Sequence, residues 1–102
     1  FKAVVLASAD GLPIAIASTD YDSDVMAAVV AMLQKVGSEA QQQLGMAEMD
    51  EVIIRSRDRI RLVCRHIVAG GQNLILIVIV PPDRYYRRVT NRAIRQIRQL
   101  LS

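Results

Sequence analysis

The stretch VVLASADGLPIAIAS, residues 4–18, decides the fold because it joins two short apolar runs through Asp10-Gly11. An Asp-Gly pair tolerates the positive φ angles of a tight hairpin turn, and the flanking runs have the length and composition of strands. We therefore predict strands over residues 2–8 and 14–18. Pro13 stands just before the second strand, where its missing N–H does least harm, and this favours an edge position for that strand.

The rest of the chain divides into a long helix, three strands and a final helix. Residues 19–24 (TDYDSD) supply N-cap candidates for a helix over residues 23–44, and Gly45 is suited to end it. The hydrophobic patterns and turn residues predict strands over 49–56, 59–68 and 73–80, and a helix over 84–101 capped by Asp83.

Residues 74–80 (LILIVIV) are apolar at every position, which indicates a central strand covered on both faces. The hairpins imply an antiparallel sheet, so the expected fold class is α+β, a three-layer α/β/α sandwich. The chain has 102 residues, 52% of them hydrophobic, which is enough for one domain with its own core. Its longest aliphatic run is far shorter than the about 20 residues of a spanning helix, so we expect no membrane insertion.

The hairpin sequence, taken together with the order of the elements, resembles the Roadblock family, named for dynein light chains among its members. The resemblance covers essentially all of residues 1–102, as a single Roadblock-like domain of the bacterial or archaeal type. It implies a longin-like (profilin-like) five-stranded antiparallel sheet in the order 2-1-5-4-3. The family normally has a short helix before the first strand. This sequence starts too late to include that helix, so we expect part of one sheet face to be less covered.

The resemblance also implies a function carried by surfaces. Bacterial and archaeal members typically regulate or dock Ras-like small GTPases, and members usually dimerise through the third strand and the helix before it. We therefore expect a non-catalytic homodimer that binds a Ras-like GTPase and modulates its GTP hydrolysis or its localisation. The single cysteine favours a reducing, cytoplasmic location. The identity of the GTPase, the choice among activation, exchange and recruitment, and what precedes Phe1 stay open.

Few residues are suited to catalysis or to metal binding. Cys64 and His66, the only cysteine and histidine, share one face of a predicted strand and are too few for a zinc site or a nucleophilic triad. Aspartates within residues 20–24 match the start of a calcium loop, but Val25 stands where that loop needs glycine, which favours helix capping. No phosphate-binding glycine loop is present. We expect no catalytic, cofactor or metal site.

The long helix has two contrasting sides. Apolar residues at i, i+3 and i+4 spacing predict one buried face: Val25, Met26, Val29, Met32, Leu33, Val36, Ala40 and Leu44. The opposite arc is uncharged and rich in small residues, which favours contact with another protein over solvation. We predict a dimer interface there and on the apolar third strand, made of Ala27, Ala31, Gln34, Ser38, Gln41, Val52, Ile53 and Ile54.

Charge is distributed unequally along the chain. Residues 1–51 hold two lysines against eight acids, whereas residues 52–102 hold eleven arginines against two acids. The final helix has a predicted core stripe of Tyr86, Val89, Ala93, Ile97 and Leu100, flanked by Ile94 and Leu101. Its other side carries Arg84, Arg87, Arg88, Arg92, Arg95 and Arg98.

These surfaces give a prediction for partner binding and one alternative function. The predicted GTPase contacts are Ala31, Gln34 and Gln42 on the long helix, with an electrostatic rim of Arg84, Arg88, Arg92 and Arg95. The alternative is a basic nucleic-acid or polyphosphate binding module that uses the arginine face. Nucleic acid is disfavoured because four aromatic residues are too few for a stacking platform.

Overall fold

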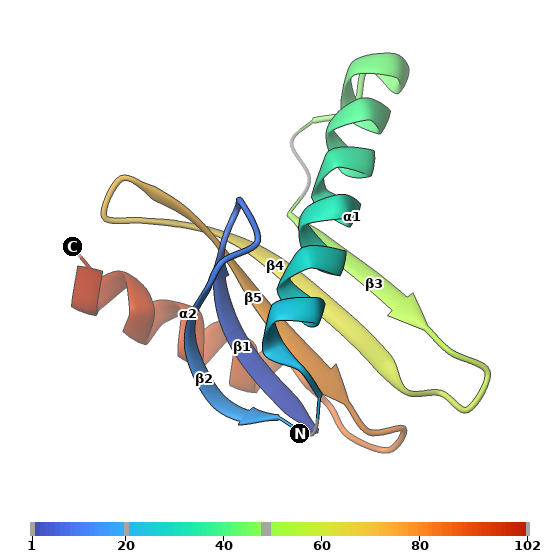
Figure 1. Cartoon of the computed structure of the whole chain (residues 1–102), viewed down its shortest axis with the longest axis vertical. Coiled ribbons are helices and arrows are strands. Elements are labelled where there is room, and N and C mark those ends of the chain that lie inside the picture. The colour runs from blue at the N-terminus through green and yellow to red at the C-terminus, as the bar shows by residue number, and fades with distance from the viewer. Residues whose placement is uncertain (1, 20, 48–49, 102) are drawn as a thin grey trace.

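The structure of the chain is a computed structural model that describes residues 2–19, 21–47 and 50–101 (Figure 1). Its elements are β1 (Ala3–Ser8), β2 (Pro13–Thr19), α1 (Ser23–Leu44), β3 (Glu51–Arg55), β4 (Arg61–Ala69), β5 (Gln72–Val80) and α2 (Arg87–Leu101). Each of the seven predicted elements is present, with ends that differ from the prediction by a few residues. Met49, the predicted first residue of the third strand, lies outside the described residues.

The five strands form one sheet in the order β2-β1-β5-β4-β3, and every neighbouring pair is antiparallel. Helices α1 and α2 cover opposite faces of this sheet (Figure 1). The predicted three-layer α/β/α sandwich and its 2-1-5-4-3 strand order are therefore confirmed. The edge position predicted for the second strand is also confirmed, and β3 forms the other edge.

Strand β5 carries the core because it lies between β1 and β4 and is buried on both faces from Leu74 to Val80. Alternate side chains enter two hydrophobic clusters. Ile75, Ile77 and Ile79 pack on the α1 side, whereas Leu74, Leu76 and Val78 pack on the α2 side. A buried side chain of this size contributes about 2 kcal/mol by leaving water, so one strand stabilises both layers.

Helix α1 is bounded as its sequence predicts. The Asp22 carboxylate accepts hydrogen bonds from the backbone N–H groups of Asp24 (2.9 Å) and Val25 (3.2 Å), so it caps the helix N-terminus. Gly45 ends the helix in the left-handed conformation, with φ 67°. The C-terminal half of α1 extends beyond the sheet (Figure 1). Asp20, another member of the aspartate group, lies outside the described residues.

Helix α2 begins at Arg87, three residues later than predicted. The Arg84 N–H bonds the Pro81 carbonyl (3.3 Å), so residues 81–84 form a turn, and the Thr90 N–H bonds the Tyr86 carbonyl (2.9 Å) as the helix starts. Asp83 consequently precedes the helix by four residues and does not occupy its N-cap. Arg84 lies on the turn, outside the helix to which the sequence assigned it.

Candidate interaction surfaces

The predicted buried face of α1 is wrong at most of its positions, although Met26 is buried and Leu33 and Ala40 are half-buried. Val25, Val29, Met32 and Val36 are exposed, with 66% of Met32 and of Val36 accessible. The side that packs on the sheet is instead formed by Met26, Ala27 and Val30, all of them buried. The helix has two apolar stripes about 140° apart, and a hydrophobic pattern by itself does not tell which stripe meets the sheet.

Small residues decide the orientation of α1 because the β1–β2 turn approaches it closely. Gly11 has φ 91°, and a Cβ at this position would lie 3.2 Å from Ala31 Cβ and 3.3 Å from the Ala27 carbonyl oxygen. The alanines at 27 and 31 leave room for this contact. The small side chains that suggested close approach of a second protomer therefore accommodate the chain's own hairpin. Ala27, only 1% exposed, is not available to a dimer interface.

The other α1 residues predicted to contact a partner differ in solvent exposure. Ala31, Gln34 and Gln41 are half-buried, whereas Ser38 and Gln42 are exposed. On an ideal helix, Ser38 and Gln42 form a third side of α1 that continues the side of Ala27 and Ala31 along the half of the helix that extends beyond the sheet, away from the exposed valines. This side and the valine stripe are the parts of α1 that a second molecule can reach.

The exposed valines of α1 continue onto edge strand β3. Ile54 lies on the α1 side of the sheet and lines an apolar groove of about 260 Å³ with Val25, Val29 and Tyr21. Val52 packs against the α1-side core, and Ile53 is exposed on the edge strand. We name Val25, Val29, Met32, Val36 and Ile54 the apolar face. This face combines an edge strand with exposed apolar side chains, and such an edge can pair with a strand of another molecule.

Helix α2 packs on the sheet with part of the predicted stripe. Val89 is half exposed and Leu100 is 83% exposed, whereas Thr90 and Ile94 are buried. Tyr86, Ala93 and Ile97 pack against the α2-side core, as predicted. Thr90 is absent from the predicted stripe because its side chain is polar, but its hydroxyl has hydrogen-bond partners in the buried position. It donates to the Arg87 carbonyl (3.1 Å) and accepts from Arg65 (3.2 Å).

Arg65 links strand β4 to helix α2 through hydrogen bonds. It lies on β4 between Val63 and Ile67, on the side that faces α2, and its Nη1 donates to Thr90 Oγ1 and to Asn91 Oδ1. Its Nε–H is buried and has no hydrogen-bond partner among the described residues. This arginine was not among the site residues predicted from the sequence. The available signal was a charged residue at an inward position of an alternating apolar strand.

A second polar contact joins edge strand β3 to the start of α2. The Tyr86 hydroxyl donates to Glu51 Oε1 (2.7 Å), and the Arg87 guanidinium lies 3.7 Å from Glu51 Oε2. The guanidinium of Arg61 lies 5.7 Å from the centre of the Tyr86 ring, within cation–π range. Burial, followed by the bond to Glu51, raises the pKa of the Tyr86 hydroxyl.

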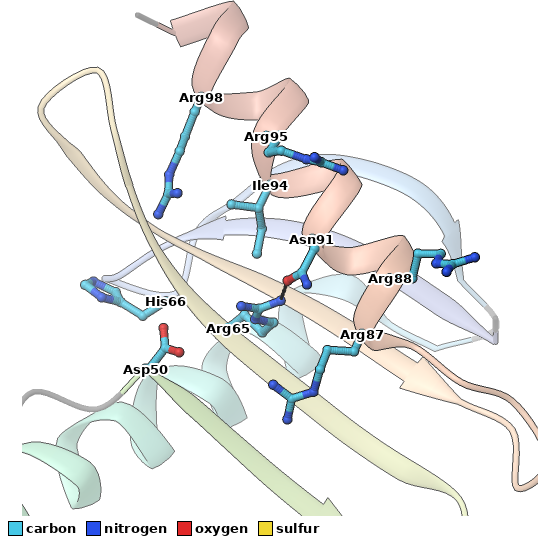
Figure 2. Close-up of a pocket in the computed structure, with 9 residues that line it drawn as sticks. All are labelled: Asp50, Arg65, His66, Arg87, Arg88, Asn91, Ile94, Arg95 and Arg98. Atoms are coloured by element: carbon cyan, nitrogen blue, oxygen red, sulfur yellow. Dashed lines mark hydrogen bonds between the residues drawn. The ribbon is translucent and has the colours of Figure 1, made fainter.

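A cavity of about 610 Å³ opens between α2 and the β3–β4 edge (Figure 2). Its lining residues come from the chain before β3, from β4 and from α2: Asp50, Arg65, His66, Arg87, Arg88, Asn91, Ile94, Arg95 and Arg98. We name it the arginine cavity. Of the six arginines predicted to form one face, it gathers four and adds Arg65, while Arg84 and Arg92 do not line it.

The residues predicted for partner binding lie on two separate surfaces of one protomer. Helices α1 and α2 lie on opposite sheet faces, so Arg88, Arg92 and Arg95 do not border Gln42 or the apolar face. The sequence had no means of assigning the two helices to the same or to opposite sides of a contact. The structure therefore separates two surfaces, one apolar and one basic.

Cys64 and His66 occupy the places that strand alternation predicts. Cys64 is buried in the α1-side cluster, and burial raises its pKa from the ordinary value of 9.0 to about 12. His66 is half-buried near the β3 edge of the sheet. Its backbone N–H donates to the Asp50 carbonyl (3.0 Å). Within residues 2–19, 21–47 and 50–101, no three His, Cys, Asp or Glu residues are grouped as metal ligands. Neither described helix has the length and hydropathy to cross a membrane.

The sheet order and its two covering helices define a profilin-like α/β/α module with exposed interaction surfaces. A family model for the Roadblock/LC7 domain matches residues 1–79. The chain therefore belongs to the Roadblock/LC7 domain family, and the resemblance seen in its hairpin is confirmed. No match was found among curated proteins.

Solved structures share this fold at low sequence identity. A Roadblock/LC7 domain from Streptomyces avermitilis is 22% identical with a TM-score of 0.76, covering 98% of this chain and 81% of that one. Myxococcus xanthus MglB is 17% identical with a TM-score of 0.83, covering 97% and 81%. The gliding protein mglB from Thermus thermophilus is 15% identical with a TM-score of 0.71, covering 98% and 74%.

Proposed function

We propose that this chain acts as a non-catalytic homodimer that binds a Ras-like small GTPase in the cytoplasm and modulates its GTP hydrolysis or its localisation. The observation that carries the proposal is the apolar face, in a chain that belongs to the Roadblock/LC7 family. A protein that works by contact needs an exposed surface that a partner can bury, and this face supplies one.

The first occupant of the apolar face is a second copy of the chain. Val25, Val29, Met32 and Val36 follow the 4-3-4 spacing of a heptad seam, which suits packing against another helix. Among the described strands, β3 forms one edge of the sheet. A twofold axis beside β3 would pair the two β3 strands and pack the two α1 helices over the junction, so one operation covers both features. One solved structure with this fold is described as MglB with a tetrameric arrangement.

Two substitutions on α1 test this interface against the one predicted from the sequence. Val29→Arg combined with Met32→Arg should weaken the dimer about a hundredfold or more, because charged side chains would be desolvated in an apolar contact. Ser38→Arg is the matched control, since Ser38 is exposed on the same helix but away from the apolar face. The measurement is sedimentation velocity over a concentration series.

The outcomes are distinct. If Ser38→Arg dissociates the dimer and the Val29–Met32 pair of substitutions does not, the interface is the α1 arc predicted from the sequence. A monomer of the unchanged chain at about 50 μM would contradict the dimer, because an interface of standard size persists at that concentration.

The GTPase docks on the paired α1 helices, through the third side that carries Ser38 and Gln42. Both side chains are exposed and uncharged, so they can be buried at a lower desolvation cost than charged ones. The test is binding of the full chain to Ras-like GTPases loaded with GDP or with a non-hydrolysable GTP analogue, by biolayer interferometry.

Gln42→Arg should lower the affinity about tenfold while the dimer persists. Arg92→Ala is the control, because Arg92 lies on the opposite sheet face. Binding that ignores Gln42→Arg but is lost with Arg92→Ala would move the GTPase site to α2. Absence of binding to every Ras-like GTPase tried would contradict the proposed function. It would not contradict the proposed dimer, which sedimentation tests separately.

A further inference from the structure

Among the described residues, the arginine cavity gathers more positive charge than the acids beside it balance. Arg87 is matched by Glu51, at 3.7 Å. The remaining lining arginines are Arg65, Arg88, Arg95 and Arg98, and the acid among the lining residues is Asp50. Figure 2 shows Arg98 reaching from α2 toward His66 and Asp50 above Arg65 of β4, whereas Arg88 and Arg95 line the cavity with their stems and direct their guanidinium groups to the other side of the helix. Like charges held this close repel one another, and a bound anion relieves the repulsion.

The inner wall of the cavity is positioned before any ligand arrives. Arg65 is held by Thr90 and Asn91 through Nη1, and the Thr90 hydroxyl is itself fixed by its bond to the Arg87 carbonyl. The Nε–H of Arg65 is buried without an acceptor among the described residues. Because this group is closed off from solvent, Arg65 contributes to the cavity wall through its fixed positive charge. This separates Arg65 from an ordinary solvated surface arginine.

The chemistry of the lining selects the class of anion. Guanidinium groups present forked donors that match phosphate oxygens in pairs, and several arginines favour a ligand with several such groups. Among the described residues that line the cavity there is no Phe, Tyr or Trp, and His66 supplies the one aromatic ring, so the surface on which a base could stack is small. A volume of about 610 Å³ is within the range of small-molecule sites.

We infer that the arginine cavity binds a compact anion carrying two or more phosphate groups, at a site separate from the apolar face. The shared chemistry is a cluster of phosphates, supplied either by a free polyphosphate or by a phosphorylated lipid headgroup. The site lies on the α2 side of the sheet, so it can be occupied while the α1 side holds protein partners.

The test uses inorganic tripolyphosphate and the full chain in isothermal titration calorimetry. We expect one tripolyphosphate per chain, with orthophosphate binding about tenfold more weakly, because fewer guanidinium groups are engaged. Affinity should fall severalfold between about 50 and 200 mM NaCl. Undetectable binding at about 1 mM tripolyphosphate would overturn the inference.

Matched variants locate the binding. Arg95→Ala combined with Arg98→Ala should weaken tripolyphosphate about tenfold or more, whereas Arg92→Ala should change it less than about twofold. All three arginines are exposed on α2, but Arg92 does not line the cavity. Equal losses from the two variants would overturn the site, because attraction to helix charge in general would then explain the binding. Arg65→Lys keeps the charge, and a loss with this variant supports the forked geometry.

Two further ligands distinguish the sources of phosphate and exclude nucleic acid. Vesicles of phosphatidylcholine containing phosphatidylinositol bisphosphate are tested with the same variants. Tighter binding to these vesicles than to tripolyphosphate, lost with the Arg95–Arg98 pair, would assign the lipid headgroup as the source. The reverse order would assign a free polyphosphate. A single-stranded oligonucleotide that binds more tightly with increasing length and outcompetes tripolyphosphate would overturn the compact ligand.

Discussion

The two helices attach to the same sheet by different means. Helix α1 is held by apolar contact and close approach, with Met26, Ala27 and Val30 against the sheet and Gly11 against the helix. Helix α2 buries Ile94 but also depends on polar bonds, from Arg65 to Thr90 and from Tyr86 to Glu51. The difference continues outward, since α1 exposes an apolar stripe and α2 exposes arginines.

This contrast indicates how one small module offers two kinds of surface. Apolar packing beneath α1 leaves its outer stripe free of charge, which suits burial by another protein. The polar bonds of α2 place Arg65 in the same cavity as arginines of the helix, and this group of cations is suited to binding an anion. Each attachment can be disturbed separately, and the expected effects differ in size.

The largest expected effect is on the close packing of α1. Ala27→Leu should lower the free energy of unfolding by about 2 kcal/mol, because a larger side chain has no room between the sheet and the hairpin. Urea denaturation followed by circular dichroism measures the change. Ala28→Leu is the matched control, since Ala28 is exposed one residue further on, and it should be nearly neutral. Equal effects would mean that α1 does not pack through Ala27.

Taken per pH unit, the next effect is that of alkaline pH on the α1 side of the core. Folding raises the pKa of Cys64 above 9.0 to about 12, so the folded state keeps a proton that the unfolded state loses. The stabilisation is complete below about pH 9 and is lost as pH rises towards 12, by up to about 1.4 kcal/mol per pH unit. Urea denaturation at increasing pH measures this slope. Cys64→Ala should flatten it, and an unchanged slope would contradict the assignment to Cys64.

The smallest expected effect is on the polar attachment of α2. Tyr86→Phe removes the hydrogen bond to Glu51 but keeps the ring, and should lower the free energy of unfolding by about 1 kcal/mol. Thermal unfolding at neutral pH is the measurement. Tyr85→Phe serves as the control, because Tyr85 is 94% exposed. A larger loss from Tyr85→Phe than from Tyr86→Phe would contradict the polar attachment of α2.

The local patterns of the chain predict the fold well. The Asp10-Gly11 turn, the alternation of the strands and the fully apolar run of β5 each act over a few residues. Their consequences are therefore visible in the sequence. The helix cap at Asp22 and the stop at Gly45 follow from the same short-range chemistry. Together they determine the elements, and with the family resemblance they predict the sheet order.

Only the tertiary structure decided which sides of the helices are free. Helix α1 has two apolar stripes, and the choice between them depends on the hairpin turn that reaches Ala27 and Ala31 from the start of the chain. The arginine cavity depends on Arg65 meeting Thr90, 25 residues later in the sequence, on a helix whose rotation is set by Thr90 and Ile94. Periodicity fixes which residues share a side, whereas contact between distant segments fixes which side is buried.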